Sequence, residues 1–231
     1  MRFFPELCVV CSCMDHSQSG LCPDCAATMP WQAPGCLRCG IETRLNFPTE
    51  LPVCQQCLDD PPAFNSCHTV FDYCSPVVEL VSRFKYGAGF AEGRVLARLL
   101  CQSLREFYTE GELPEILVPV PSHRSRLRRR GFNQAIELAR VVSRHTGIAL
   151  SLTDCQRVHA SKAQRGLSAQ ERRQNMVGAF SLHRNRHLRQ YRRLAIIDDV
   201  VTTTATVHEL ARCLRHDEGQ RIDVWAVARV N

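Results

Sequence analysis

The sequence predicts an α/β fold in which a parallel sheet with helices on both faces follows a small cysteine-rich module. Two short apolar runs, Ile116–Val120 and Leu194–Ile197, have the composition of buried parallel strands. A polar stretch follows each run, and apolar residues at helical spacing come next. Before these runs, eight of the 14 cysteines lie in close pairs near the amino terminus. The strand–turn–helix succession predicts a Rossmann-like core, and the cysteine pairs predict a separate small domain.

Length and composition set the outer limits. At 231 residues, of which 45% are hydrophobic, the chain can form one α/β domain with a small appendage. It contains no apolar run of about 18 residues, so we expect no membrane insertion. The first ten residues contain Pro5 and Glu6 and lack the apolar core of a signal peptide. We therefore expect a cytoplasmic protein.

The net charge of +6 is unevenly distributed along the chain. Residues 1–70 contain three basic and seven acidic side chains, a balance of −4. Residues 121–193 contain seventeen basic and three acidic side chains, a balance of +14. This segment predicts a polyanionic ligand, which can be a pyrophosphate, a nucleotide or a nucleic acid.

The paired cysteines predict two structural zinc sites. The C-x-x-C spacing allows two thiolates to reach one tetrahedral Zn²⁺, and two pairs complete a Cys₄ site. Disulfides are the alternative, but the chain shows no export signal and the cytosol is reducing. The predicted metal ligands are Cys8, Cys11, Cys22, Cys25, Cys36, Cys39, Cys54 and Cys57.

The simplest assignment joins the first two pairs in one site and the last two in the other, although crossed or nested pairings also satisfy the spacing. Cys13 is a spare thiol or a substitute for Cys11. The run Asp59-Asp60-Pro61-Pro62 is a natural hinge. We therefore predict a double zinc ribbon over residues 1–60 and a second domain over residues 66–231.

Within the second domain, alternation and helical periodicity predict the elements in order. The expected strands are Thr69–Tyr73, Ile116–Val120, Ser151–Cys155, Leu194–Ile197 and Asp223–Val227. The expected helices run from Pro76 to Lys85, over Ala91–Phe107, over Gln134–His145 and from Val207 to about Arg215. The stretch 157–180 is long, polar and basic, and such loops are typically functional lids.

The stretch Leu194–Thr206 carries the clearest functional pattern. Two carboxylates, Asp198 and Asp199, close the apolar strand. The turn after them contains the hydroxyls of Thr202, Thr203, Thr204 and Thr206. A turn between the end of a parallel strand and the start of a helix is a ligand site of α/β folds, and the helix start favours a phosphate. Adjacent carboxylates suit sugar hydroxyls or a hydrated Mg²⁺. Together these groups describe a site for a ribose 5-phosphate.

Two other interpretations of this stretch compete. The aspartates can be solvated strand ends without a ligand. A Walker B strand of an ATPase requires a G-x-x-x-x-G-K-[ST] loop elsewhere in the chain. The chain has only two lysines, Lys85 and Lys162, and neither follows a glycine, so the ATPase interpretation is excluded.

A basic stretch that contains the arginines between 124 and 130 follows the strand Ile116–Val120, and we expect it to be a loop. It precedes the helix Gln134–His145, so it faces the same edge of the sheet. Guanidinium groups bind phosphates in a bidentate manner and keep their charge. The alternative is a solvated basic surface. The candidate pyrophosphate ligands are Arg124, Arg128, Arg129 and Arg130, with Lys85 from a preceding helix end.

Asp198–Thr206 resembles the signature of type I phosphoribosyltransferases, which bind phosphoribosyl pyrophosphate (PRPP). The resemblance implies that Asp198 and Asp199 hold the ribose, with Mg²⁺ as cofactor, and that Thr202, Thr203, Thr204, Ala205 and Thr206 surround the 5-phosphate. Thr204 stands where that signature has glycine. If the backbone there requires a positive φ, a threonine is strained by about 1–3 kcal/mol.

Further motifs narrow the resemblance to the ComF (competence protein F) family, a zinc module joined to a phosphoribosyltransferase-like domain. These motifs are R-G-F-N-Q at 130–134, Q-x-x-L-S-x-x-x-R-x-x-N at 164–175 and G-A-F at 178–180. The resemblance implies a role in bacterial competence, that is, in uptake and use of DNA. The balance favours an enzyme, a glycosyltransferase of the phosphoribosyltransferase type. The alternative is a non-catalytic adaptor that binds single-stranded DNA or proteins of the competence machinery, with a degenerate PRPP site.

Overall fold

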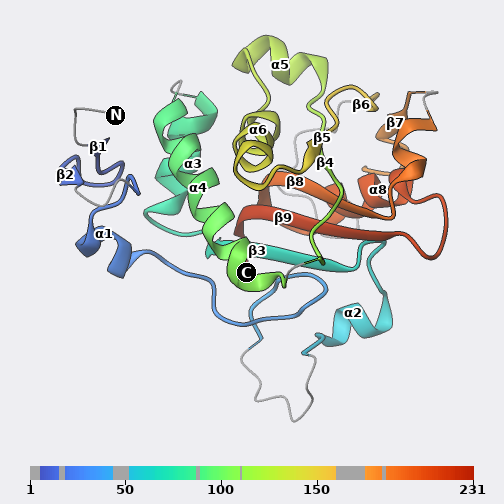
Figure 1. Ribbon diagram of the computed structural model, residues 1–231, viewed down its shortest axis with the longest axis horizontal. Coiled ribbons are helices and arrows are strands. Elements are labelled where there is room, and N and C mark those ends of the chain that lie inside the picture. Colours follow the sequence, from blue (N-terminus) through green and yellow to red (C-terminus); the bar gives the residue numbers. More distant parts are fainter. Residues whose placement is uncertain are drawn as a thin grey trace.

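The computed structural model confirms an α/β fold with a five-stranded parallel sheet flanked by helices (Figure 1). The structure describes residues 6–15, 19–43, 52–86, 89–109, 111–159, 175–183 and 186–231. The strand order is β3-β9-β8-β4-β5, and every neighbouring pair is parallel. In that order the strands are Ser66–Asp72, Arg221–Arg229, Arg193–Val201, Ile116–Pro119 and Ala149–Leu150.

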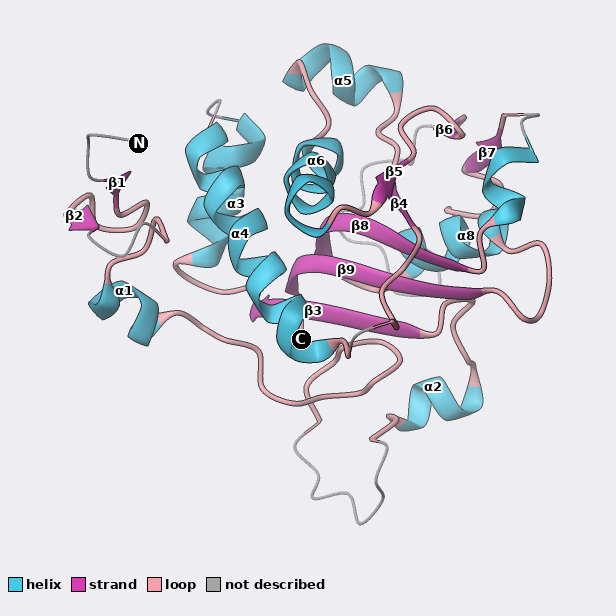
Figure 2. Cartoon of the chain, viewed as in Figure 1, coloured by secondary structure: helices cyan, strands magenta, loops and turns pink. Residues whose placement is uncertain are grey.

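Helices cover both faces of the sheet because its strands are apolar on both sides. In β8, Ala195 and Ile197 belong to one core cluster with α3, α4 and α6, while Leu194 and Ile196 belong to a second cluster with α8. This alternation follows from the two-residue repeat of a strand. Figure 2 shows the helices on the two sides of the sheet. They are α3 Val77–Tyr86, α4 Phe90–Phe107, α6 Gln134–Thr146 and α8 Ala205–Leu214.

The two halves of the cysteine-rich segment dock at different places on the sheet domain. The first half packs on α4, where a Cβ on Gly20 would lie 2.2 Å from a methyl group of Val95. In the second half, the carbonyl of Leu37 accepts a hydrogen bond from the backbone N–H of Cys67 in β3 (3.2 Å). The elements of this segment are β1 Glu6–Leu7, β2 Met14–Asp15, α1 Pro23–Thr28 and α2 Gln55–Asp59. The division into domains 1–60 and 66–231 stays a prediction.

The basic stretch after β4 is a helix, α5 Arg124–Arg130, and the expectation of a loop was wrong. The His123 imidazole caps the helix by accepting a hydrogen bond from the backbone N–H of Ser125 (3.2 Å). Gly131, with φ 82°, ends it in the left-handed conformation that glycine adopts readily. Arginine has a high helix propensity, so a cap and a stop on either side of seven residues are sufficient here.

The expected strand Ser151–Cys155 was also wrong. The Ser151 hydroxyl donates to Asp154 Oδ2 (2.6 Å) and stabilises a turn between two short strands. One of these strands is β5, and the other is β6 Cys155–Arg157, which leaves the main sheet and pairs antiparallel with β7 Phe180–Leu182. Strands β6 and β7 contain the two ends of the predicted 157–180 lid. Residues 160–174 of this lid lie outside the described part. A 3₁₀-helix, Arg186–Gln190, leads from β7 to β8.

The strands that carry the site extend further than expected. Strand β8 continues to Val201, so Asp198 and Asp199 lie within it instead of closing it, and Asp198 pairs in register with Ala226. Strand β9 continues to Arg229. The apolar core of each strand was visible in the sequence, but the polar ends pair through backbone groups, which leave no periodic signal.

In the part of the chain that the structure describes, no helix is both long and apolar enough to span a membrane. Helix α4, with 18 residues, includes Glu92, Arg94, Arg98, Arg105 and Glu106.

Candidate functional site

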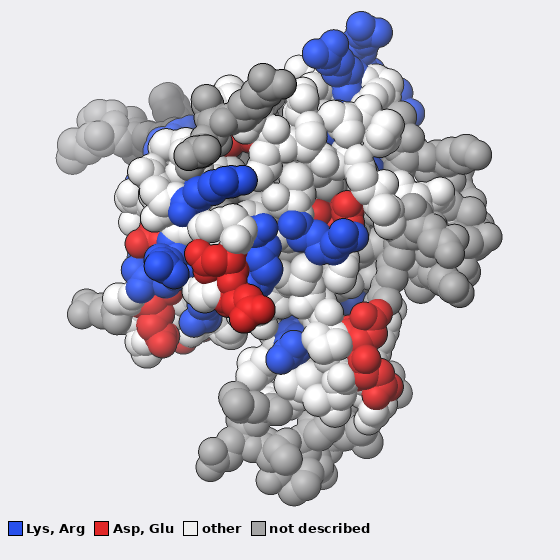
Figure 3. Space-filling view, turned by 90° about the vertical axis from the view of Figure 1, so that its right-hand side faces the viewer, with Lys and Arg blue, Asp and Glu red and all other residues white. Residues whose placement is uncertain are grey.

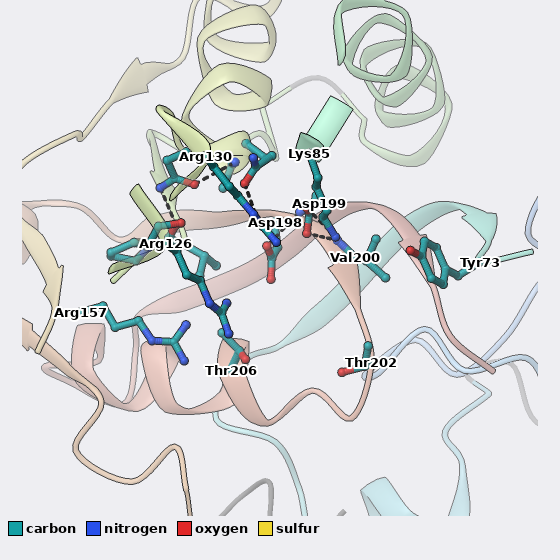
Figure 4. Close-up of a pocket in the computed structure, with 16 residues that line it drawn as sticks. Tyr73, Lys85, Arg126, Arg130, Arg157, Asp198, Asp199, Val200, Thr202 and Thr206 are labelled. Carbon is teal, nitrogen blue, oxygen red and sulfur yellow. Dashed lines mark hydrogen bonds and ion pairs between the residues drawn. The ribbon is translucent and has the colours of Figure 1, made fainter. Parts of the chain in front are cut away.

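A pocket of about 230 Å³ lies at the carboxyl edge of the sheet, where β4 and β8 end and α6 and α8 begin (Figure 4). This is the edge at which parallel α/β sheets bind their ligands. Its lining comes from several separate parts of the chain, so the fold and not one local motif creates it. The lining residues are Tyr73, Lys85, Val120, Pro121, Ser122, Arg126, Arg130, Asn133, Gln134, Ala135, Arg157, Asp198, Asp199, Val200, Thr202 and Thr206.

The two predicted carboxylates lie side by side at the floor of this pocket. Asp198 Oδ1 accepts a hydrogen bond from the backbone N–H of Asp199 (2.9 Å). Asp199 Oδ2 forms an ion pair with Lys85 Nζ at 3.0 Å. Burial lowers the pKa of Lys85, but the charge of Asp199 and the hydrogen bond to it outweigh this effect, and the pKa lies above its ordinary value. Lys85, predicted as a pyrophosphate ligand, is therefore paired with Asp199 in this structure.

Asp198 is in a different environment. Its side chain is partly buried and lines the pocket, and it lacks a cation of its own at ion-pair distance among the described residues. Burial, with the adjacent charge of Asp199, raises the pKa of Asp198 to about 7. The floor of the pocket thus combines a paired carboxylate with one that gains from an additional cation or from hydroxyl donors. A ribose diol with a divalent cation supplies both.

The residues of the turn after β8 line two different cavities. The side chains of Thr202 and Thr206 line the pocket, whereas those of Thr203 and Thr204 face a neighbouring cavity, and Ala205 is buried. Helix α8 begins at Ala205, so its first backbone N–H groups, which have no acceptor within a helix, are next to Thr206. A phosphate in this position would be bound by the amino end of a ten-residue helix.

Thr204 adopts the positive-φ backbone conformation in which a threonine is strained. Its φ of 60° lies in the left-handed region, and it is one of two non-glycine residues with positive φ among the described residues. Its hydroxyl donates to the carbonyl of Thr203 (2.6 Å). A β-branched residue in this region is strained by roughly 1–2 kcal/mol. The turn keeps the backbone shape that glycine permits, although the residue is threonine.

We therefore expect Thr204→Gly to raise the free energy of unfolding by about 1 kcal/mol, since relief of strain exceeds the added entropy of glycine in the unfolded chain. Urea denaturation measures the change. Thr203→Gly is the matched control, because its φ is not positive, and it should destabilise the protein. A destabilising Thr204→Gly would contradict the strain.

Three guanidinium groups converge on the pocket. Arg126 and Arg130 come from α5, and Arg157 comes from β6. Figure 4 shows Arg126 and Arg157 pointing toward Thr206, with Asp198 between them and the Lys85–Asp199 pair. Burial lowers the pKa of Arg157 to about 10, so its side chain remains charged at neutral pH. The pocket is therefore divided into a cationic half beside the start of α8 and an acidic floor.

Of the residues predicted to hold pyrophosphate, Arg130 and Lys85 line this pocket. Arg124 lines a neighbouring cavity, and the side chains of Arg128 and Arg129 are exposed on α5. Because α5 is a helix, arginines at adjacent positions point in different directions, and only Arg126 and Arg130, four residues apart, face the pocket. Figure 3 shows basic side chains projecting at the top of the molecule, where Figure 1 places α5.

Two buried donors in the pocket wall have no hydrogen-bond partner among the residues that the structure describes. They are Arg130 Nε and Gln134 Nε2, while other atoms of the same two side chains bond each other (Arg130 Nη1 to Gln134 Oε1, 3.0 Å). Arg130 Nη2 also donates to the Tyr86 hydroxyl (2.8 Å). Buried donors without acceptors are unfavourable by about 1–3 kcal/mol each. An anion bound in the pocket would satisfy them, so the wall fits a phosphate-bearing ligand.

Sequence reasoning missed Arg157 and Gln134 as site residues, and it included Arg126 only as one of the arginines between 124 and 130 without selecting it as a candidate. Gln134 carried a signal, because it ends the R-G-F-N-Q motif on which the family resemblance rests. Asn133 in the same motif caps α6 and donates to the carbonyl of Val120 (3.0 Å), which fixes the turn that borders the pocket. Arg157 carried no local signal, since only the position of the β6–β7 pair brings it to the pocket.

The eight predicted zinc ligands form two groups of four. In each group the sulfur atoms lie within 4.8 Å of one another. The groups are Cys8, Cys11, Cys22 and Cys25, and Cys36, Cys39, Cys54 and Cys57. The structure thus has the simplest of the pairings that the spacing allows. Cys13 belongs to neither group, although its Sγ lies 3.1 Å from that of Cys11.

The sulfur geometry fits zinc. Sulfur atoms bound at about 2.3 Å to a tetrahedral ion lie about 3.8 Å apart. The Cys11–Cys22 and Cys39–Cys54 Sγ distances, which join the two pairs of each group, are both 3.7 Å. The backbone N–H of Cys54 also donates to Cys36 Sγ (3.3 Å), a contact that stabilises a thiolate. Both groups fit structural zinc sites.

Comparisons with known proteins find a family that matches the cysteine-rich segment and relatives that match nearly the whole chain. Residues 2–58 match the double zinc ribbon domain family. The chain is 37% identical to competence protein F of Haemophilus influenzae over 232 residues, which cover 99% of each protein. It is 34% identical to DNA utilization protein YhgH of Salmonella typhimurium, again over 99% of each. Competence protein ComFC of Bacillus subtilis is 25% identical over 70% of this chain and 65% of the relative.

Similarity at this level, along nearly the whole of both proteins, includes the zinc module and the sheet domain together. The match therefore reflects a shared architecture and not one common motif. With its two Cys₄ groups and its parallel sheet, the chain belongs to the competence protein F family.

Proposed function

We propose that the chain binds PRPP with Mg²⁺, transfers the phosphoribosyl group, and acts in this way in the uptake and use of DNA. One observation carries the proposal. A single pocket combines adjacent carboxylates, the amino end of a helix with threonine hydroxyls, and a cluster of arginines. These are the groups that a ribose, a 5-phosphate and a pyrophosphate require. The names of the relatives, competence protein and DNA utilization protein, support the cellular role.

The acidic floor is assigned to the ribose. Asp198 and Asp199 would accept hydrogen bonds from the two hydroxyls, and bound Mg²⁺ would supply the positive charge that Asp198 lacks. Lys85 holds the Asp199 carboxylate in place through their ion pair. The 5-phosphate is assigned to the start of α8, with the Thr202 and Thr206 hydroxyls and the backbone N–H groups of residues 203–206 as donors.

The pyrophosphate is assigned to the cationic wall formed by Arg126, Arg130 and Arg157. In the transfer step, the bond between ribose C1 and the pyrophosphate oxygen breaks, and its electron pair leaves with the pyrophosphate. A nucleophilic atom of the acceptor forms the new bond to C1. Negative charge grows on the leaving oxygen, so fixed guanidinium groups stabilise the transition state more than the ground state.

Calorimetric titration with PRPP and Mg²⁺ tests the proposal. The unmodified protein should bind, and Asp199→Asn should weaken binding at least tenfold, because it removes a charged acceptor from the ribose site. Glu218→Gln is the matched control, since Glu218 is an exposed carboxylate outside the pocket, and it should bind normally. No binding at about millimolar PRPP would exclude the proposed site.

A DNA-binding adaptor is the second candidate, and the surface of α5 favours it. Arg124, Arg128 and Arg129 are exposed, lie outside the pocket, and are not needed for one pyrophosphate. Basic side chains of this kind follow the phosphates of single-stranded DNA. The binding would be mainly electrostatic and would weaken steeply with salt.

Fluorescence anisotropy with a labelled oligonucleotide separates the candidates. If α5 binds DNA, replacing Arg124, Arg128 and Arg129 by Gln should weaken binding at least tenfold at about 50 mM salt, while saturating PRPP leaves binding unchanged. The control replaces Arg140 and Arg144, exposed on α6, and should have a smaller effect. If PRPP displaces the oligonucleotide, both ligands share the pocket. No retention at about 50 mM salt would exclude direct DNA binding.

A further inference from the structure

The second Cys₄ group and the threonine turn lie on opposite walls of one cavity. This cavity, of about 190 Å³, is lined by Cys39 and Cys57 on one side and by Thr202–Thr204 on the other. Thr202 also lines the ligand pocket. The turn is therefore the wall that separates the ligand pocket from the second Cys₄ group, which contains Cys36, Cys39, Cys54 and Cys57.

Arg229 connects the two walls. It is 5% exposed, at the carboxyl end of β9, where it pairs in register with Val201 of β8. Its Nε donates to the carbonyl of Cys39 (3.0 Å), and its Nη1 donates to the carbonyls of Val201 (3.3 Å) and Thr202. One rigid guanidinium thus binds two parts of the chain. The first is the loop at Cys39 and Gly40, called the knuckle below, which carries one cysteine of the second Cys₄ group. The other is the first residue of the turn.

The knuckle that Arg229 contacts is itself fixed to the sheet. Gly40, with φ 71°, follows Cys39, and a Cβ there would lie 3.2 Å from the carbonyl of Cys67 in β3. The Gln32 amide donates to the carbonyl of Gly40 and accepts from the hydroxyl of Thr69. Arg229 thus joins a knuckle that carries one of the four cysteines to the turn. The first Cys₄ group packs on α4 instead, and among the described residues it forms no hydrogen bond with the turn.

We propose that Arg229 is a positioning residue that couples zinc at the second site, but not at the first, to the conformation of the turn at residues 202–206. The consequence for phosphate affinity rests on the proposed function. The coupling itself is a property of the unliganded protein. Arginine is required because a lysine ammonium cannot donate in one plane to the carbonyls of Cys39 and Thr202 at once.

Hydrogen–deuterium exchange of the zinc-loaded protein without ligand tests the coupling. Arg229→Lys should raise the exchange rate of peptides covering residues 202–206 about tenfold. Arg221→Lys is the control on the same strand, because Arg221 lies at the other end of β9 and donates to Asp223. It should leave the exchange of the turn unchanged.

A second pair of variants keeps Arg229 intact and uses the two metal sites as each other's control. Cys54→Ser and Cys11→Ser should each reduce zinc from two ions to one per chain, but only Cys54→Ser should raise exchange at residues 202–206. Equal effects of the two cysteine variants, or an unchanged turn in both Arg229→Lys and Cys54→Ser, would overturn the proposal. PRPP titration of the same proteins is read separately. If PRPP does not bind even the unmodified protein, the proposed function fails, whereas the exchange result still decides the coupling.

Discussion

Removal of zinc with a chelator is expected to unfold the amino-terminal segment and to lower the thermal midpoint of the whole protein by more than about 10 °C. The segment has little regular structure to stabilise it. Its helices α1 and α2 contain six and five residues, too few to be stable without tertiary support. The buried cysteines are its core, and structural zinc contributes about 10–16 kcal/mol per site in small domains at pH 7.

Elemental analysis should give two zinc ions per chain before chelation, and circular dichroism should report the loss of stability after it. The control is chelator saturated with zinc beforehand, which should have no effect. Protein that contains no zinc, with its cysteines oxidised and its thermal midpoint insensitive to chelator, would contradict the metal sites.

The second large effect is expected from Asp198→Asn, which should stabilise the unliganded, Mg²⁺-free protein by roughly 1–3 kcal/mol at pH 8. Burial and the charge of Asp199 raise the pKa of Asp198 from its ordinary 3.8 to about 7. The folded state then binds more protons than the unfolded state between these values. The stability that protonation of Asp198 contributes is fully present below about pH 4 and is lost as the pH rises through 7.

The difference in unfolding free energy between Asp198→Asn and the unmodified protein should therefore increase from pH 5.5 and level off above about pH 7. Urea denaturation across this range measures it. Asp199→Asn is the neighbouring control with the opposite expected sign, because it leaves Lys85 buried without its partner. A difference that does not change with pH, or a destabilised Asp198→Asn, would contradict the environment described for Asp198.

The same stretch shows how far sequence reasoning reached. The strand, turn and helix around Asp198 and Thr206 were predicted because their apolar periodicity is local. The two carboxylates and the turn do line one pocket with Lys85 and Arg130. The pairing of cysteines could be narrowed by spacing but not decided, since each C-x-x-C pair fits any other. The structure decided it by bringing Cys39 and Cys54 to 3.7 Å.

The sequence could not show in which direction each arginine side chain points. Five arginines between 124 and 130 were equivalent as long as the stretch was taken to be a loop. The helix directs Arg126 and Arg130 to the pocket, and Arg128 and Arg129 to solvent. Arg157 reaches the pocket because β6 pairs with β7 outside the main sheet, and short polar strands have no strong pattern. The left-handed backbone at Thr204 could not be predicted, because threonine seldom adopts this conformation.

The position of β9 has a consequence for synthesis on the ribosome. This strand follows all the others in sequence, yet it lies between β3 and β8. Until it emerges, β3 lacks its partner in the main sheet, and the facing edges of β3 and β8 carry unpaired backbone groups that attract other strands. Pairing of β9 with both neighbours joins β3 to β8 in one sheet. A chain that terminates before β9 therefore keeps these edges unpaired, which exposes it to aggregation and proteolysis.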